Sequence, residues 1–516
     1  MSAEHRPRRW MKKLLLRRVF VALLLLAQIV FIALNIVYYS KLRWFSSLWQ
    51  IVGFLTALHL TAHSQHNTSF KISLAFLILV FPVFGVIFYW IFHYQTATHG
   101  FRKRLHKKEV ETSPAFALIP DKSDTACMEN GDAGRLIRYL REVSGFPACA
   151  NTETEYFADG LDYQAALLRE LKQAKRYIFL EYFIIGEGVF WDSVLEILRE
   201  RAAAGVDVRV IYDDVGSLLT LPTDFAARLK RDGIQCLVFN RFRPFLTSIQ
   251  NNRDHRKIAV VDGKVAFTGG INIADEYINV RERFGHWKDA GILLRGDGAW
   301  SFTVMFLQMW SFLTNRTEQC ENYLPPQEER GERQVAGWVQ PYTDSPMDEH
   351  TVGEHVYRHL IAGAKNYVYI TTPYLMVEND LISTLKIAAE SGVDVRIITP
   401  HKPDKKLVHF TTRSYYRELL SSGVRIFEYS DGFIHSKNFV VDDRMGSVGT
   451  VNMDFRSLYL HFECGTCLYG TDSLQDVKED FLKTQEKCTE ITEKTWRKNP
   501  FVAFLQDICR LFAPMM

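Results

Sequence analysis

Long apolar runs occupy the first 92 residues of this 516-residue chain, and shorter apolar stretches alternate with polar ones after them. Val19 to Tyr39 is an apolar run with only two polar interruptions, and Ile72 to Phe92 is a second run. About 20 residues of helix cross a bilayer core, so both runs predict membrane helices. We expect Pro82 and Gly85 to be tolerated inside the second helix.

The segment between these runs, Trp44 to Ala62, is less apolar because Gln50, His59 and several hydroxyl side chains interrupt it. It either spans the membrane or lies against its neighbours. A cleaved signal peptide is disfavoured, because the first run is long and no small-residue cleavage site follows it. Burial of these helices in a soluble core is the remaining alternative, and the length of the runs speaks against it.

Two basic clusters flank the apolar region. The positive-inside rule places both clusters in the cytoplasm, which requires an even number of crossings. We therefore expect that Trp44 to Ala62 does not span fully and that the large remaining part is cytoplasmic; three crossings would place that part outside. The second cluster also suits anionic lipid headgroups. The clusters are Arg6, Arg8, Arg9, Lys12, Lys13, Arg17 and Arg18, and Arg102, Lys103, Arg104, Lys107 and Lys108.

After a polar connector from about 110 to 170, the pattern of strand, helix and strand occurs twice. Short, dense apolar stretches predict strands with both faces covered, and the alternation is typical of βαβ units. The pentapeptide Gly-Val-Asp-Val-Arg occurs identically in both copies. The predicted elements are a helix at Gly160–Ala174, then Arg176–Ile185, Trp191–Ala203 and Gly205–Asp214 in the first copy, and Asn366–Tyr374, Leu381–Ser391 and Gly392–Pro400 in the second.

These observations predict an α/β fold made of two duplicated domains, a pseudo-twofold pair of βαβ-type sheets, with N-terminal transmembrane helices. The predicted division is a membrane anchor at 1–110, a first half at 111–330 and a second half at 331–516. The charged, proline-containing segment Asn315 to Ser345 is the expected joint. Trp496 to Met516 predicts a helix that packs on the body, with an amphipathic membrane contact as the alternative.

Composition narrows the class of protein. A net charge of +3 does not suit a nucleic-acid-binding polycation, so no nucleic-acid partner is expected. Eight scattered cysteines are too few for a disulfide framework and suit a reducing compartment. Cys464 and Cys467 form a lone CxxC, which we interpret as strand cysteines without a metal or redox role.

One octet occurs once in each copy. It is His255-Arg-Lys257-Ile-Ala-Val-Val-Asp262 in the first copy and His435-Ser-Lys437-Asn-Phe-Val-Val-Asp442 in the second. Asn272 and Asn452 each follow their histidine by seventeen residues. Because residues i and i+2 of a strand share a face, each half offers an imidazole and an ammonium together.

Two such halves meeting at a twofold axis suit a phosphodiester. The lysines and asparagines would hold the phosphate oxygens, one imidazole would attack phosphorus, and the other would protonate the leaving alcohol and later deprotonate the incoming one. No further residues have metal-ligand spacing, so neither a metal nor another cofactor is expected. Oligomeric state is left open.

A nucleophilic imidazole needs its other nitrogen held by an acceptor. We expect Glu463 to orient His435 and Asp289 to orient His255, with surface or loop charges as the alternative. Asp262 and Asp442 belong to the catalytic motifs, but each ends its strand before a turn. For these two, a turn-capping or structural role competes with a catalytic one.

At these residues the chain resembles the phospholipase D superfamily, whose two HxKxxxxD motifs form one active site, and most closely bacterial cardiolipin synthases. The resemblance covers nearly the whole chain, less clearly at Thr112–Thr152 and Asn315–Ser345. His461 stands where the family usually has asparagine, which puts the acceptor-lipid preference in doubt. Other matching stretches are Asn67–Lys71, Phe81–Gly85, Glu181–Ile185, Tyr212–Gly216, Asn252–Lys257, Gly269–Tyr277, Thr372–Tyr374 and Gly446–Ser457.

The resemblance implies transfer of a phosphatidyl group between two phosphatidylglycerol molecules, giving cardiolipin and glycerol at a bacterial cell membrane. It suggests His255 as nucleophile and His435 as acid and base, although the symmetry of the motifs alone leaves their order open. A phospholipase D-type hydrolase or headgroup exchanger is the main alternative. A nuclease fits poorly with the apolar runs, and a non-catalytic membrane scaffold predicts that His255→Ala changes nothing.

Overall fold

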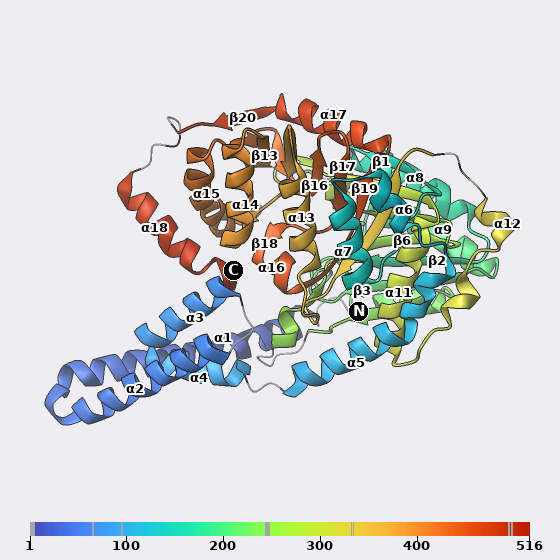
Figure 1. Ribbon diagram of the computed structural model, residues 1–516. Coiled ribbons are helices and arrows are strands. Elements are labelled where there is room, and N and C mark those ends of the chain that lie inside the picture. Colours follow the sequence, from blue (N-terminus) through green and yellow to red (C-terminus); the bar gives the residue numbers. More distant parts are fainter. Residues whose placement is uncertain are drawn as a thin grey trace. The chain divides into compact units, whose positions relative to one another are not determined.

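The computed structural model describes residues 6–63, 67–93, 96–242, 248–331, 333, 335–493, 496 and 499–516 (Figure 1). The chain forms two compact units. The first comprises Met1–Lys103, Phe242–Asn251 and Asp507–Met516, and the second comprises Arg104–Arg241 and Asn252–Gln506. The side chains of the first basic cluster lie outside the described residues. The predicted boundaries at 110 and 330 stay a prediction.

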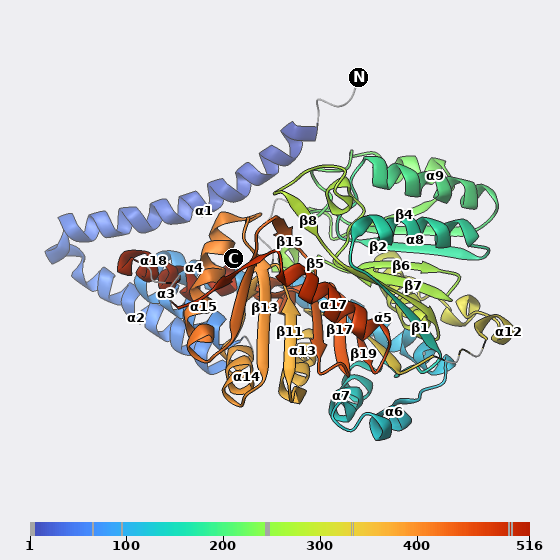
Figure 2. The ribbon, with the colours of Figure 1, turned by 90° about the horizontal axis from the view of Figure 1, so that it is seen from above.

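The second unit contains two large sheets with the same internal order, which confirms the predicted α/β duplication. The first sheet has the order β1-β9-β7-β6-β2-β3-β4 and the second has β10-β19-β17-β16-β11-β13-β14, with β20 added at its edge. Figure 2 shows both sheets within this unit. The first sheet consists of β1 (Thr152–Phe157), β2 (Tyr177–Tyr182), β3 (Asp207–Asp213), β4 (Gln235–Phe239), β6 (Lys257–Val261), β7 (Val265–Gly269) and β9 (Gly291–Gly296). The second consists of β10 (Trp338–Asp344), β11 (Tyr367–Thr371), β13 (Asp394–Pro400), β14 (Arg425–Tyr429), β16 (Asn438–Val441), β17 (Met445–Gly449), β19 (His461–Tyr469) and β20 (Cys488–Ile491).

Each sheet is mixed rather than fully parallel. β2, β3 and β4 pair in parallel, and so do β11, β13 and β14. The motif strands β6 and β16 run antiparallel to β2 and β11. All residues of β2 and of β6 are buried, as expected for strands covered on both faces. The two cysteines of the CxxC sequence, Cys464 and Cys467, lie on a strand as predicted, and both are buried in β19.

Helices cover these sheets, and those predicted from the sequence are present. α8 and α9 pack over the first sheet, and α13 and α14 are their counterparts in the second half. α11 lies on the first sheet and also contacts β10, whereas its counterpart α17 lies on the second and also contacts β1. The bounds are α8 (Gly160–Gln173), α9 (Val189–Ala203), α10 (Phe225–Arg231), α11 (Gly298–Thr314), α13 (Val352–Gly363), α14 (Asn379–Glu390), α15 (Lys406–Ser421), α16 (Phe455–Tyr459), α17 (Ser473–Gln485) and α18 (Pro500–Leu511).

The repeated pentapeptide has a clear local role. Its glycines, Gly205 and Gly392, follow α9 and α14 with φ values of 87° and 93°. This left-handed backbone ends a helix and is tolerated best by glycine. The four residues that follow each glycine lead directly into β3 or β13. The repeated pentapeptide therefore forms the connection between a helix and the next strand.

Two segments contain more regular structure than predicted. The connector from 110 to 170 includes α6 (Ser123–Glu129), α7 (Gly134–Ser144) and strand β1. α7 is amphipathic and buries Leu136, Ile137 and Leu140, a helical spacing hidden in a polar stretch. The joint Asn315–Ser345 includes α12 (Gln327–Arg330) and runs into β10.

The first unit contains α1 (Arg6–Val37), α2 (Tyr39–His63), α3 (Thr68–Val80), α4 (Pro82–His93) and the start of α5 (Thr96–Thr112). Among the described residues one helix is long and apolar enough to cross a membrane, and it covers Arg43–Ala62. Where the structure describes the side chains, shorter apolar helical stretches cover Ala22–Val37, Thr68–Val80 and Pro82–Ile91, and the start of the first predicted run, at Val19, lies outside this part of the chain. The segment that we expected not to span fully, Trp44–Ala62, therefore meets the length criterion.

The prediction of one continuous helix over Ile72–Phe92 is wrong. The chain leaves the helix at Phe81, and α4 begins at Pro82. Proline cannot donate a backbone hydrogen bond and disfavours helical backbone in the residue before it. At Gly85 a Cβ atom would lie 2.5 Å from the Cα of Ile78, so glycine permits a close approach of α4 to α3.

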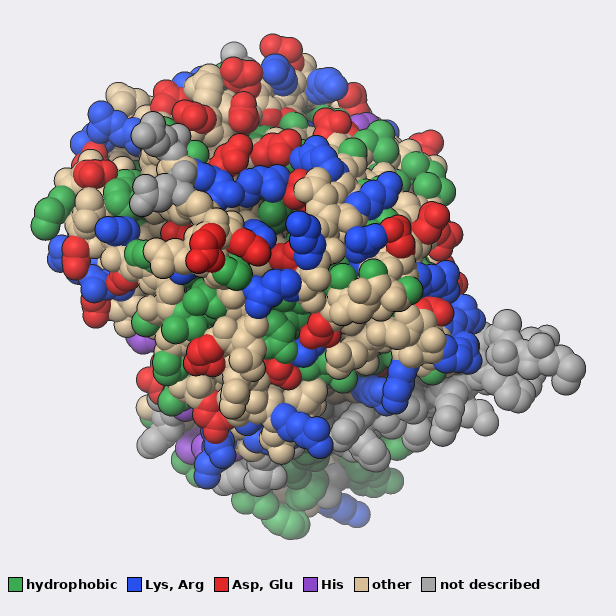
Figure 3. Space-filling model, turned by 90° about the vertical axis from the view of Figure 1, so that its right-hand side faces the viewer, with side chains coloured by type: hydrophobic (Ala, Val, Ile, Leu, Met, Phe, Trp, Pro, Cys, Tyr) green, Lys and Arg blue, Asp and Glu red, His purple; other side chains and the backbone are tan. Residues whose placement is uncertain are grey.

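Three short strands connect the two halves of the second unit. β5 (Arg253–Asp254) pairs with β19, and β8 (His286–Lys288) pairs with β15 (Gly432–Ile434). β5 directly precedes one motif histidine and β15 the other. On the face shown in Figure 3, Lys and Arg side chains are interspersed with Asp and Glu.

Candidate active site

Each motif histidine is held against the opposite half of the duplication. The backbone N–H of His255 donates to the carbonyl oxygen of Phe462 at 2.9 Å, and that of His435 donates to Lys288 at 2.7 Å. These bonds continue the short pairings β5–β19 and β15–β8. Both histidines are buried, with exposed fractions of 6% and 7%.

The orienting carboxylates are crossed between the halves. His255 Nδ1 lies 2.9 Å from both carboxylate oxygens of Glu463. His435 Nδ1 lies 2.7 Å from Oδ2 of Asp289. The predicted pairing of Glu463 with His435 and of Asp289 with His255 is therefore wrong, although both carboxylates do contact a motif histidine. The short strands explain this crossed pairing. β5 places His255 beside β19, which contains Glu463, and β15 places His435 beside β8, which Asp289 follows.

The two carboxylates differ in their surroundings. Glu463 accepts hydrogen bonds from the hydroxyls of Thr450 and Ser457, and burial raises its pKa to about 8. Asp289 accepts from the indole N–H of Trp287 at 3.3 Å. Burial alone would raise the pKa of Asp289, but His435 and its neighbouring lysine outweigh that effect and lower it.

Both motif lysines are buried beside their histidines, as the shared strand face predicts. Lys257 Nζ donates to the backbone carbonyl of His255 at 2.6 Å. Lys437 Nζ donates to the backbone carbonyl of His435 and lies 2.9 Å from its Nδ1. Burial lowers the pKa of Lys257 to about 8 and that of Lys437 to about 7. These ammonium groups are therefore poorly solvated and available to an anion.

Electrostatic coupling also joins the two motifs. Burial is the main reason that the pKa of His255 lies well below its usual value, and the charges of Lys257, Lys437 and His435 contribute in the same direction. Burial likewise lowers the pKa of His435 to about 4, against the opposing effect of Asp289. Both imidazoles are therefore neutral at pH 7 before an anion binds.

The two motif asparagines are placed differently. Asn272 is already engaged, since its Oδ1 accepts from the backbone N–H of Ile184 at 2.9 Å and its Nδ2 donates to Tyr277 at 2.7 Å. Asn452 is buried, and its Oδ1 has no hydrogen-bond partner among the described residues. Asn452 is thus the more available of the two for a ligand.

For Asp262 and Asp442 the structure supports the structural role. The carboxylate of Asp262 accepts from the backbone N–H groups of Lys175, Arg176 and Tyr177 at 2.8 to 2.9 Å. Asp442 accepts in the same way from the backbone of residues 365–367 at 2.6 to 2.9 Å. Asp262 lies five residues beyond Lys257 along an extended strand, roughly 16 Å away.

One group of described side chains has ligand atoms close enough to hold a metal ion. They come from His255, His461 and Glu463 and lie within 4.8 Å of one another. Nδ1 of His255 is already hydrogen-bonded to Glu463, and two buried lysines add positive charge that opposes a cation. The arrangement fits a bound anion better, and the expectation of no metal stays a prediction.

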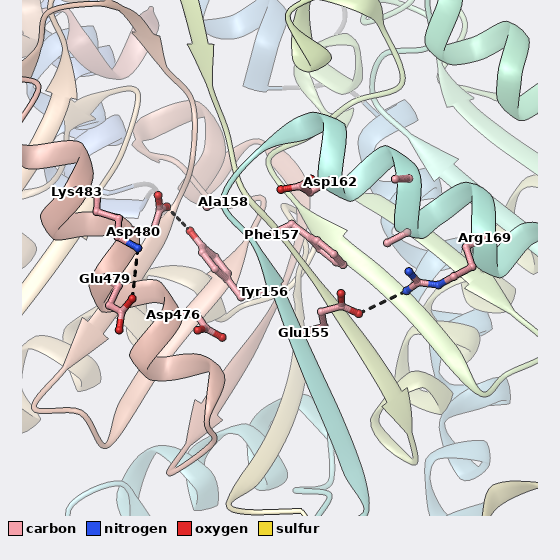
Figure 4. Close-up of a pocket in the computed structure, with 12 residues that line it drawn as sticks. Glu155, Tyr156, Phe157, Ala158, Asp162, Arg169, Asp476, Glu479, Asp480 and Lys483 are labelled. Carbon is pink, nitrogen blue, oxygen red and sulfur yellow. Dashed lines mark hydrogen bonds and ion pairs between the residues drawn. The ribbon is translucent and has the colours of Figure 1, made fainter.

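A separate cavity of about 530 Å³ opens between β1 and α17 (Figure 4). Its lining has more acidic than basic side chains: Glu155, Asp162, Asp476, Glu479 and Asp480 against Arg169 and Lys483. This acidic lining repels an anionic headgroup. The motif histidines do not line it, so a phosphodiester is expected at the histidines and not in this cavity.

Comparison with known proteins decides the family. A protein-family profile described as "Cardiolipin synthase, PLD-like domain" matches residues 167–283 and 357–484, one match in each half. A cardiolipin synthase of Geobacillus sp. is 35% identical over 443 residues, covering 84% of this chain and 87% of that protein. The chain belongs to the cardiolipin synthase family. This confirms the resemblance drawn from the two motifs.

Other relatives cover as much of the chain. A cardiolipin synthase of Halalkalibacterium halodurans is 34% identical over 92% of this chain and 94% of its own length. An uncharacterized protein of Streptococcus mutans is 42% identical over 88% of this chain and 98% of its own length. Cardiolipin synthases are phosphatidyltransferases of phospholipid biosynthesis, so the chain is an enzyme of this class.

A solved structure supports the fold. The crystal structure of phosphatidylserine synthase from Haemophilus influenzae matches 75% of this chain and all of that chain, with a TM-score of 0.55 and 15% identity. Together with the two profile matches, this establishes two PLD-like domains in this member of the cardiolipin synthase family.

Thr450, Ser457 and Trp287 had no role in the sequence-based prediction, and His461 entered it only as a departure from the family pattern. Thr450 and Ser457 hold Glu463, and Trp287 holds Asp289. The ring of His461 lies 5.5 Å from that of His255, and neither of its ring nitrogens has a hydrogen-bond partner among the described residues. A sequence feature could have pointed to two of these residues, because His461 and Trp287 each precede an orienting carboxylate by two residues.

Proposed function

We propose that this protein is a cardiolipin synthase that transfers a phosphatidyl group from one phosphatidylglycerol to another through a phosphohistidine intermediate. The single observation that supports this most strongly is the crossed pair of histidines, each buried and each bonded at Nδ1 to a carboxylate of the other half. This leaves the Nε2 atom of each imidazole for the reacting groups.

The first chemical step forms the covalent intermediate. Nε2 of His255 attacks phosphorus, a P–N bond forms, and the P–O bond to the glycerol headgroup breaks. His435, protonated once the anionic phosphate is bound, gives its proton to the leaving glycerol oxygen. An ionised Asp289 beside His435 favours this imidazolium.

The second step reverses these roles. His435 takes the proton from a hydroxyl of the acceptor phosphatidylglycerol, the hydroxyl oxygen bonds to phosphorus, and the P–N bond to His255 breaks. Cardiolipin and a neutral His255 result. The same group acts as acid and then as base, as microscopic reversibility requires.

The phosphate itself needs positive charge and hydrogen-bond donors. Lys257 and Lys437 supply two buried ammonium groups, and the buried Asn452 supplies an amide whose Nδ2 can donate to a phosphate oxygen. Such preorganised donors stabilise the charge that develops on the non-bridging oxygens. Asn272 is assigned a supporting role, because it already binds Ile184 and Tyr277.

The substrate also sets the location. A phosphatidylglycerol transferase works at a lipid surface, and the first unit supplies apolar helices, one of which is long enough to span. We place the protein in the bacterial cell membrane as a multi-pass protein, with the catalytic unit on the cytoplasmic side as the two basic clusters suggest. The bilayer is then its partner, and a nucleic acid is not.

A second candidate, exchange with another alcohol or with water, rests on His461. The imidazole of His461, which is 10% exposed and has no hydrogen-bond partner among the described residues, stands beside His255, where the family usually has asparagine. A different donor at this position changes which acceptor is held best. The molecule that accepts the phosphatidyl group would then differ from phosphatidylglycerol, whereas the attack on the donor lipid would be the same.

The test is a product assay with purified full-length protein and phosphatidylglycerol. The synthase reading predicts cardiolipin and glycerol in equal amounts, with His255→Ala and His435→Ala lowering the rate by three orders of magnitude or more, roughly. His359→Ala, a half-buried histidine of α13 outside the site, is the matched control and should retain activity. Glycerol release without cardiolipin would instead support the hydrolase or exchanger, and activity in both alanine variants would refute histidine catalysis.

A further inference from the structure

The α18 helix carries an apolar stripe on its outer side. Phe501, Phe504, Leu505 and Ile508 follow the i, i+3, i+4, i+7 spacing of a single helix face. Their exposed fractions are 64%, 60%, 38% and 40%. In a helix of a soluble domain this spacing normally marks the buried face.

The opposite side of the same helix is the attached one. Gln506 is only 3% exposed, and its side-chain amide donates to the carbonyl oxygen of Phe410 at 3.0 Å. The helix therefore docks through the face that contains Gln506, while the two phenylalanines of the stripe point away from that contact. A contiguous exposed apolar face of this kind marks an interaction surface.

The C-terminal end of α18 contacts one of the apolar N-terminal helices. Residues Asp507–Met516 belong to the same compact unit as the apolar helices α1 to α4. The hydroxyl of Ser73 on α3 donates to the carbonyl oxygen of Leu511. The ring of Phe512 lies 6.0 Å from that of Phe76, and Phe76 is itself 43% exposed.

We propose that α18 is an interfacial helix whose stripe inserts among the acyl chains at the edge of the bilayer. This goes beyond the transfer reaction, but it rests on the membrane location proposed above. Lipid is favoured over a second copy of the chain because the end of α18 packs on the same helix, α3, whose Ile72 and Leu79 are also exposed. α18 carries one acidic and one basic residue, Asp507 and Arg510, so apolar contact and not headgroup charge is expected to dominate.

The direct test is site-specific photocrosslinking of the full-length protein in phosphatidylcholine vesicles. A photoreactive phenylalanine analogue replaces Phe504 in one variant and Leu161, an exposed leucine of α8, in the matched control. We expect lipid adducts at position 504 and few at 161. A crosslink to a second protein chain, no lipid adduct, or equal labelling at both positions would overturn the proposal.

A second measurement uses turnover. Phe504→Glu combined with Ile508→Glu should raise KM for phosphatidylglycerol in vesicles by roughly tenfold, and leave kcat on detergent-dispersed lipid unchanged. Leu161→Glu should change neither the KM in vesicles nor kcat in detergent. Thermal midpoints equal to that of wild type, in the double variant and in Leu161→Glu, show that folding is intact. An unchanged vesicle KM would refute the proposal. Failure of the synthase reaction itself leaves the crosslink readout intact, so the two failures are distinguishable.

Discussion

At the scale of single residues, the two motif imidazoles are alike in sequence but not in surroundings. His435 faces Asp289, whose pKa is lowered despite burial by the positive charges beside it. His255 faces Glu463, whose pKa burial raises to about 8. A more fully ionised partner favours the imidazolium, so His435 suits the acid and His255 the nucleophile, in agreement with the order that the resemblance suggests.

The crossed carboxylates give a prediction that separates the two roles. A phosphatidyl ester of p-nitrophenol has a leaving group that needs no proton. With this substrate Asp289→Asn should release p-nitrophenol at close to the wild-type rate, because only acid catalysis by His435 is impaired. Glu463→Gln should be slower by about 10²-fold or more, because an amide can also donate to Nδ1 and then no longer fixes the His255 tautomer whose Nε2 is free to attack. Stopped-flow absorbance measures both, and equal losses would contradict the assignment.

The lysines predict a pH dependence of substrate binding. Lys437 and Lys257 have pKa values lowered to about 7 and about 8 by burial. Their ammonium forms exist below these values, so attraction for the phosphate weakens as pH rises from 6.5 to 8.5. KM for phosphatidylglycerol should rise several-fold over this range. Lys437→Arg keeps its charge and should flatten the profile; an equally steep profile in this variant would show that Lys437 is not responsible.

At the scale of elements, the last residue of each motif explains its fixed spacing. Strand β6 runs from Lys257, beside the site, to Val261, and Asp262 follows directly at the far end of the strand. There Asp262 has a φ of 52° and its carboxylate binds the backbone that starts β2. The spacing of the motif therefore matches one strand length, with chemistry at one end and a structural clamp at the other.

This clamp predicts a loss of stability without a loss of chemistry. Asp262→Ala removes an acceptor from three backbone N–H groups and should lower the free energy of unfolding by roughly 3 kcal/mol. The thermal midpoint should fall by several degrees, while kcat per folded enzyme and KM stay within about twofold of wild type. Asp192→Ala, at an exposed position of α9, is the control. A large fall in kcat at an unchanged thermal midpoint would contradict the structural role and support a catalytic role for Asp262.

The elements also show what the sequence could and could not predict. The helices α8, α9 and α14 were predictable as helical stretches between strands, and strands β2 and β3 were predictable as short, dense apolar stretches. The helix break at Phe81 was not recognised, since Pro82 and Gly85 stand inside an uninterrupted apolar run. β5, β8 and β15 have only two or three residues each, too few for any periodic pattern.

At the scale of the whole molecule, duplication alone predicted that the two motifs converge. It did not predict which carboxylate serves which histidine, because the symmetry permits both pairings. The distinction depends on β5–β19 and β15–β8, contacts between residues about 150 to 210 positions apart. Only the three-dimensional arrangement places Glu463 against His255 and Asp289 against His435.

The same arrangement predicts that one chain contains one complete site. Both crossed pairs form within a single chain, so a chain with His255→Ala and a chain with His435→Ala should not repair one another when produced together. Activity should stay at the level of each variant alone. If the halves exchanged between chains, random pairing would restore roughly one quarter of wild-type activity. Radiolabelled cardiolipin formed by the co-expressed, co-purified variants measures this, and joint production of wild type with either variant calibrates the expression level. Partial recovery would show that the site is assembled from two chains, and none is expected because each histidine already has its carboxylate at 2.7 to 2.9 Å within its own chain.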